Sequence, residues 1–209
     1  EAEFQYGAYP IHTNLFLHVN DLTERSDASV RPFFIGSRGG SQHRLGEATT
    51  LSGALAFWLY RGSDHAAQFR LYPQLRLRHM LSDNWSLEAA YDPAVEERTL
   101  AGLLEQNPYL MLATNIRQTD IPLRFEAAAS FDNRASTAAR VGLRWSSSSS
   151  WPRYSLLPDP VRQQWQILYN GQTSVAEITG QFKHAFSPRT HLQADAVIRE
   201  HIRQTSDIR

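Results

Sequence analysis

Arginine side chains on alternate positions are the main candidates for chemistry in this sequence. They recur in three extended segments, as Arg70, Arg76, Arg78, Arg124, Arg140 and Arg144. A row of guanidinium groups on one face attracts anionic solutes or lipopolysaccharide. Acidic residues share the alternation, as Glu88, Glu126, Glu177 and Asp195. A structural charge network is therefore the favoured interpretation. The arginines that remain candidates for binding in an enclosed lumen are Arg76, Arg78, Arg140 and Arg144.

Other residue types give weaker signals. Histidines such as His79 and the pair His184 and His191 lack the spacing and clustered carboxylates of a metal site, so no metal is expected. The serine run 146–150 is loop-like, and no Gly-x-Ser-x-Gly elbow exists, so we predict no catalytic residue and no enzyme. The glycine-rich stretch 36–46 lacks the lysine of a phosphate loop and is predicted to form a turn. No cofactor is expected.

A second set of binding candidates lies in a predicted long loop, where functional residues commonly occur. These are Trp151, Arg153 and Tyr154. Two aromatic residues and the arginine between them in the sequence are the candidate ligand contacts in this part of the chain.

Composition excludes several classes of protein. The 209 residues carry 21 basic and 21 acidic side chains, so the formal charge is zero and no nucleic-acid partner is expected. All but one of the basic residues are arginine, the exception being Lys183. No cysteine is present, and no apolar run approaches the 18 residues that indicate a transmembrane helix.

Period-two alternation dominates the chain and predicts long strands. The segment 69–81 alternates over its whole length and is followed, after Ser82-Asp83-Asn84, by a second alternating segment, 85–91. Two more hairpins of this design occupy 123–145 and 176–202. Three-residue turns predict three facing charge pairs: Arg78 with Glu88, Glu126 with Arg140, and Glu177 with Arg199.

Long connections separate these hairpins. The segments 93–121 and 147–173 hold most of the Pro-rich and Ser-rich sequence. We predict one β-barrel region over 1–209, with roughly nine or ten strands. Residues 1–60 hold the less certain strands, at 12–21 and 30–35, and a stronger one begins within them at 52–61. Three clear hairpins lie in 69–202. Short turns at one end and long loops at the other are the plan of outer-membrane barrels.

The apolar face of these strands favours contact with lipid. It is rich in alanine, and aromatic residues lie near strand ends, as expected for belts at the membrane surface: Trp58, Tyr60, Trp85, Tyr91 and Trp145. A strand exposed to lipid must pair its whole backbone with neighbouring strands, which forces closure into a barrel. The predicted fold class is thus all-β, an antiparallel transmembrane β-barrel or a portion of one.

Residues 69–202 contain a series of short motifs. They are Tyr91-Asp92-Pro93, Thr99-Leu100, Asn107-Pro108-Tyr109-Leu110 before the strand at 122–131, then Tyr169-Asn170-Gly171, Glu177 and the turn Ser187-Pro188-Arg189. Together these motifs resemble the barrel of TonB-dependent outer-membrane receptors. The resemblance implies a receptor or transporter barrel. Such receptors also carry a plug domain, a segment that contacts TonB, a terminal aromatic residue and about 22 strands. These features have no counterpart here, so we expect a fragment or a plugless relative.

The leading hypothesis is an outer-membrane barrel of a Gram-negative bacterium, receptor-like or active in solute transport or binding. One alternative is a non-transporting, structural or partner-binding subunit of an envelope complex. Another is a soluble secreted β-domain that binds a ligand. The expected partners are outer-membrane lipid and, as further candidates, other envelope proteins; the solute stays open.

Overall fold

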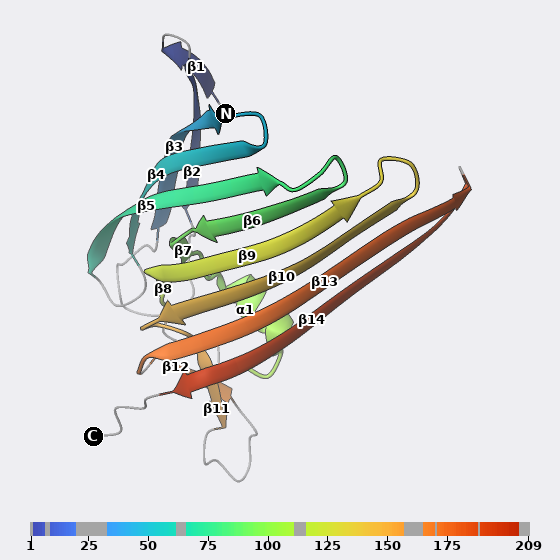
Figure 1. Cartoon of the computed structure of the whole chain (residues 1–209). Helices are drawn as coiled ribbons and strands as arrows, with labels where there is room; N and C mark the ends of the chain where they lie inside the picture. The colour runs from blue at the N-terminus through green and yellow to red at the C-terminus, as the bar shows by residue number, and fades with distance from the viewer. Residues whose placement is uncertain are drawn as a thin grey trace.

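The chain forms a large antiparallel sheet with two small strand pairs and one helix. The structure, a computed structural model, describes residues 2–6, 9–19, 33–61, 66–110, 116–156, 165–169, 171–187 and 189–204. Ten strands hydrogen-bond in the order β1-β2-β3-β4-β5-β6-β9-β10-β13-β14. They lie side by side in one curved sheet (Figure 1). In the described part of the chain β1 and β14 are the two sheet edges, so this sheet is open.

The strands of the main sheet are long, as the alternation predicts. Their bounds are β1 Ala2–Tyr6, β2 Tyr9–Val19, β3 Phe33–Leu45, β4 Thr49–Arg61, β5 Ala67–Met80, β6 Trp85–Tyr91, β9 Leu123–Asp132, β10 Thr137–Ser148, β13 Thr173–Ser187 and β14 Thr190–Gln204. The predicted fold class, an antiparallel sheet of the β-barrel type or a portion of one, is confirmed, as is the placing of short turns opposite long loops. The single-region assignment of 1–209 stays a prediction, and the expected strand limits at 20–21 and 30–32 lie outside the described residues.

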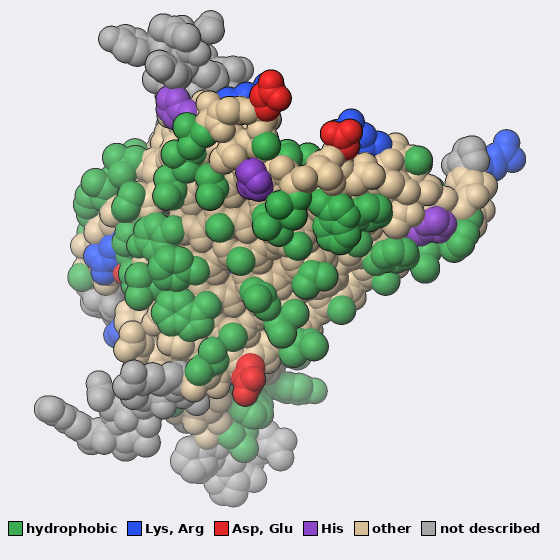
Figure 2. Space-filling view, viewed as in Figure 1, with side chains coloured by type: hydrophobic (Ala, Val, Ile, Leu, Met, Phe, Trp, Pro, Cys, Tyr) green, Lys and Arg blue, Asp and Glu red, His purple; other side chains and the backbone are tan. Residues whose placement is uncertain are grey.

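Alternation separates two faces of the sheet. The outer face carries exposed apolar side chains on seven neighbouring strands, including Leu55, Leu77, Leu87, Phe125, Leu143, Ile178 and Ile198. Figure 2 views this face, where hydrophobic side chains predominate and charged ones lie mostly near the margins. The inner face carries the charged residues and the long loops. No helix among the described residues is long and apolar enough to cross a membrane.

Two of the three predicted registers are confirmed. Arg78 faces Glu88 across β5 and β6, and Glu177 faces Arg199 across β13 and β14. The predicted register of the middle hairpin is wrong by four residues, because Glu126 faces Arg144 rather than Arg140. An even shift leaves every side chain on its predicted face.

Asn133 causes the wider turn of the middle hairpin. Its side-chain oxygen accepts hydrogen bonds from the backbone N–H groups of Ala135, Ser136 and Thr137 at 3.0, 2.9 and 2.8 Å. Arg134 adopts a left-handed conformation with φ of 59°. An asparagine that satisfies three amides stabilises a longer turn than composition suggests.

The predicted turn at 36–46 is also wrong, because β3 runs through most of it. Gly40 explains why glycine occurs inside this strand. A Cβ added there would lie 2.6 Å from the carbonyl oxygen of Gly53 and 2.7 Å from Cβ of Ala54. The close approach of β3 to β4 therefore requires glycine at this position.

Gly40→Ala is expected to destabilise the sheet by about 2 kcal/mol, because backbone must move to admit the methyl group. Gly53→Ala is the matched control on the adjacent strand, since a Cβ there meets nothing within 4 Å. Urea titration of the two refolded variants measures the difference. Equal stability of both variants would contradict the close approach.

Both long connections contain structure of their own. The first, residues 93–121, holds β7 Ala94–Glu96, α1 Leu100–Gln106 and β8 Thr119–Ile121. Thr99 caps α1, accepting a hydrogen bond from the Gly102 amide at 3.1 Å. The second, residues 147–173, holds β11 Arg153–Leu156 and β12 Trp165–Leu168. Figure 1 shows α1 and the small strands grouped behind the sheet, on the side that Figure 2 does not show.

The loops pack on the inner face and on each other. Val95 of β7 lies in a core with Phe34, Ala56, Trp58 and Tyr60. A second core joins the two loops through Leu103, Leu110, Ile116 and Ile167. Trp58 and Tyr60 are thus buried beneath a loop, and their assignment to a membrane belt is wrong.

The other predicted belt residues lie on the outer face. The Trp85 and Phe131 rings are 5.1 Å apart near the turns. At the loop end, Phe125 lies between Tyr91 and Trp145, at 5.1 and 6.0 Å. Two aromatic rows with leucine, valine and alanine between them match the pattern of a lipid-facing wall.

Candidate functional site

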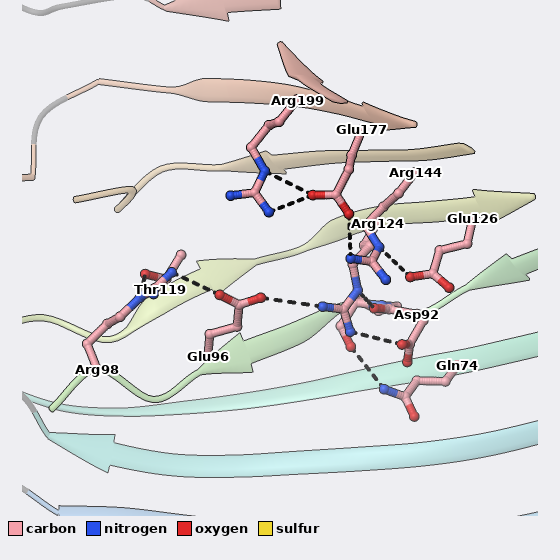
Figure 3. Close-up of polar contacts among 11 residues, drawn as sticks. Gln74, Asp92, Glu96, Arg98, Thr119, Arg124, Glu126, Arg144, Glu177 and Arg199 are labelled. Atoms are coloured by element: carbon pink, nitrogen blue, oxygen red, sulfur yellow. Dashed lines mark hydrogen bonds and ion pairs between the residues drawn. The ribbon is translucent and has the colours of Figure 1, made fainter. Parts of the chain in front are cut away.

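Polar contacts fix the first loop to the inner face. Arg124 of β9 donates to the carbonyl oxygen of Asp92 at 2.7 Å and to its carboxylate at 2.9 Å. The third guanidinium nitrogen of Arg124 lies 3.6 Å from the Glu96 carboxylate, which in turn accepts from Arg98 at 2.9 Å. Gln74 donates to the carbonyl oxygen of Pro93 at 3.0 Å. Residues of the main sheet and of the first loop therefore form one connected set of polar contacts (Figure 3).

Asp120 forms a second attachment of the same loop. Its carboxylate accepts from Arg70 Nε at 2.6 Å and from the Tyr72 hydroxyl at 2.5 Å. The Asp120 amide donates to Ser150 Oγ at 3.1 Å, and that hydroxyl donates to the Gln118 carbonyl. The carboxylate is buried, so these bonds hold β8 against β5 and tie it to the second loop.

A line of alternating charges crosses β9, β10, β13 and β14. Arg144 lies between Glu126 and Glu177, with nitrogen–oxygen distances of 2.5 and 3.1 Å. The other oxygen of Glu177 accepts from Nε and a terminal nitrogen of Arg199 at 2.9 and 2.6 Å. Glu177 is 7% exposed, whereas both arginine side chains are about half exposed. Figure 3 shows this line beside the Arg124 contacts.

A cavity of about 320 Å³ opens where this charged line meets the loops. Its lining includes arginines from strand and loop, two acids and two aromatic residues: Arg98, Arg124, Arg144, Arg199, Glu96, Glu177, Trp151 and Tyr154. The Arg98 guanidinium lies over the Trp151 ring, 5.7 Å from its centroid. The Tyr154 hydroxyl donates to Gln106 at 2.9 Å. Burial raises the pKa of Tyr154, and the positive charge of Arg98 offsets part of that rise. Such a cavity presents hydrogen-bond donors beside aromatic rings, which suits solute binding.

The structure brings some of the predicted binding residues together. Trp151 and Tyr154 from the loop set line this cavity with Arg144 from the lumen set. Arg153 points elsewhere and donates to Thr173 at 3.1 Å. The remaining predicted arginines lie nearer the turns, where Arg76 and Arg140 contact Glu88 at 3.7 and 3.4 Å and Arg78 lines a different cavity.

Sequence reasoning missed Arg98 and Arg199 as cavity residues. Arg199 carried a signal, because it shares the alternation of β14 and its predicted partner Glu177 lines the same cavity. Arg98 carried none, since it follows β7 in a loop whose path the sequence does not show. Within the described residues, no group of three or more histidine or acidic side chains could hold a metal ion.

Comparison with known proteins shows a fold but no family. No protein-family model matches the chain, and no curated protein matches it. Among solved structures, the FrpB iron transporter of Neisseria meningitidis (F3-3 variant) matches with a TM-score of 0.51 and 13% identity. The match covers 82% of this chain and 27% of the transporter chain. The F5-1 variant matches with a TM-score of 0.49 and 12% identity over the same shares.

The sheet of this chain is thus similar in fold to part of a transporter barrel. It spans about a quarter of the length of the transporter chain, with 27% covered. The resemblance to receptor barrels in residues 69–202 has support from the fold alone.

Proposed function

We propose that this chain forms part of the wall of a bacterial outer-membrane β-barrel that binds or transports a solute. In this proposal the outer face contacts lipid, and the inner face borders a water-filled lumen. The loop-covered cavity with Arg144, Trp151 and Tyr154 is the proposed point of solute contact. The likeness to part of an iron transporter barrel supports a transport-related fold.

The observation that carries the proposal is the contrast between the two faces. Apolar side chains from β4 to β14 stay exposed on the outer face, among them Phe57, Phe69, Phe125 and Val141. The loops cover the opposite, charged face instead. A soluble sheet would turn its apolar face toward the loops. Exposed apolar surface of this extent indicates a membrane or a large protein partner, and the paired aromatic rows favour the membrane.

Quenching of tryptophan fluorescence by brominated lipids tests this assignment. Two variants of the protein each keep one of its five tryptophans, with phenylalanine at the others. Trp85 is 47% exposed on the outer face, whereas Trp58 is 6% exposed beneath the first loop. In proteoliposomes, lipid brominated near the headgroup is expected to quench Trp85 strongly and Trp58 little. Equal quenching of the two, or none of Trp85, would reject a lipid-facing outer surface.

A further inference from the structure

A second cavity, of about 340 Å³, lies at the turn end of the sheet, away from the long loops. Strands β5, β6, β9, β10 and β13 contribute to its lining. Its charged lining residues are Arg78, Arg134, Arg140, Lys183, Asp83 and Asp132. Four cations against two carboxylates leave a formal excess of two positive charges.

Two of these cations have no partner within the described part of the chain. Arg78 faces Glu88 in the register, yet the Glu88 carboxylate contacts Arg76 and Arg140 instead. Lys183, the one lysine of the sequence, lies opposite Ala138 and Gln193. Both side chains are exposed to the cavity rather than held in an ion pair.

One of the two acids of the lining, Asp132, is engaged with its own turn, and Asp83 contacts the neighbouring turn through its backbone. The Asp132 carboxylate accepts from the Arg134 amide at 2.7 Å. The carbonyl of Asp83 accepts from the Arg134 side chain at 3.3 Å, which holds two neighbouring turns together. Asp195, on the nearby part of β14, accepts from Gln193 at 2.8 Å and does not line the cavity. Positive charge from Arg78 and Lys183, which are unpaired among the described residues, is therefore available to a ligand.

The loop-end cavity has the same formal excess in its lining, but its cations are paired differently. There each of the four arginines contacts a carboxylate: Arg98 with Glu96, Arg124 with Asp92, Arg144 with Glu126 and Glu177, and Arg199 with Glu177. Every cation that lines the loop-end cavity thus has a carboxylate partner, whereas Arg78 and Lys183 at the turn end have none among the described residues.

We propose that the turn-end cavity binds a compact oxyanion with two or more negative charges, such as a phosphate or a polycarboxylate. Arg78 and Lys183 supply charge from strands on either side, and Arg140 adds donors from between them. Guanidinium and ammonium groups both bind such oxyanions. The cavity volume lies at the lower end of the usual range for small-ligand sites. The proposal needs only access of water to the inner face, so it stands apart from solute transport.

Calorimetric titration of the full-length protein in an uncharged detergent tests this site, with inorganic pyrophosphate and citrate as probes at low ionic strength. Arg78→Gln and Lys183→Gln are each expected to weaken binding about tenfold, because each removes one unpaired positive charge. The double variant is expected to weaken binding about a hundredfold. Arg78→Lys keeps the charge and is expected to bind within about threefold of the parent protein. Arg189→Gln is the matched control, since Arg189 lies in an exposed turn outside the cavity.

Each outcome decides the proposal. Loss of affinity in the cavity variants with normal affinity in the Arg189 variant supports the site. The probe with the higher affinity then shows whether the site favours a phosphate or a polycarboxylate. No binding of either probe, or equal loss in all single variants, overturns it. Displacement of pyrophosphate by dihexanoyl phosphatidic acid at a tenfold lower concentration would assign the site to a lipid headgroup and also overturn it. None of these results bears on the quenching of Trp85 by lipid.

Discussion

Ile198→Arg is expected to destabilise the protein in lipid by about 2–4 kcal/mol, the cost of an arginine near the middle of a lipid-facing barrel surface. Ile198 is 67% exposed, so a substitution there would have little effect on a protein surrounded by water. It belongs to a row across the sheet that includes Leu143 and Ile178, between the two aromatic rows. The predicted cost therefore comes from the surrounding lipid and not from packing within the chain.

Val197→Arg provides a matched control on the same strand. Val197 is 62% exposed and points to the inner face, with Asp195 and Arg199 as its neighbours in the alternation. Arginine there would lie in water beside a carboxylate and is expected to change stability by less than about 0.5 kcal/mol. Urea unfolding in lipid vesicles measures both variants. Equal free energies of unfolding for the adjacent substitutions would show that both faces meet the same solvent.

The sequence predicted the faces of the sheet well because alternation is a local property. Every apolar position from Phe69 to Leu77 that the pattern assigned to one face lies there, and Arg70 and Arg76 lie on the other. Short turns gave correct registers where their length was unambiguous, as for Arg78 with Glu88. The middle hairpin failed because one asparagine side chain satisfied three amides and lengthened the turn.

The paths of the long loops could not be predicted. Trp58 and Tyr60 alternate like inner-face residues, yet as aromatics near a strand end they also suit a membrane belt; only the position of Val95 above them decides between the two. Asp120 is an isolated acid in the sequence, and its contacts with Arg70 and Tyr72 span about fifty positions. Contacts of this range depend on tertiary structure, which local patterns do not contain.

The candidate site was predicted only in part, because local patterns place the strand residues but not the loop residues. Strand residues such as Arg144 follow the alternation, so their face was known from the sequence. Trp151 and Tyr154 were chosen only because they lie in a loop, and their position beside Arg144 comes from the fold of both loops. The cavity near the turns escaped notice because the expected pairing of Arg78 with Glu88 holds in the register but not between the side chains.

Glu177→Gln is expected to lower the free energy of unfolding by about 3 kcal/mol, because loss of a charge from a buried ion-pair network leaves its partners uncompensated. The Glu177 carboxylate makes three contacts of 3.1 Å or less with Arg144 and Arg199. Both guanidinium groups retain partial access to water, which keeps the expected value at the lower end for broken buried pairs. Glutamine preserves the shape, so the variant isolates the charge.

Glu126→Gln separates a network from isolated ion pairs. Among the described residues the Glu126 carboxylate contacts Arg144 alone, and Arg144 keeps Glu177 when that contact weakens, so about 1 kcal/mol is expected. Adding Arg199→Gln to Glu177→Gln should recover part of the loss, because it removes the cation that has lost its carboxylate partner, whereas Arg144 keeps Glu126. Urea unfolding in vesicles of Glu177→Gln, Arg199→Gln, their double variant and the parent protein gives the coupling free energy directly. A loss below about 0.5 kcal/mol for Glu177→Gln would mean that water solvates these charges as it does on an ordinary surface, and that the inner face is not organised around Glu177.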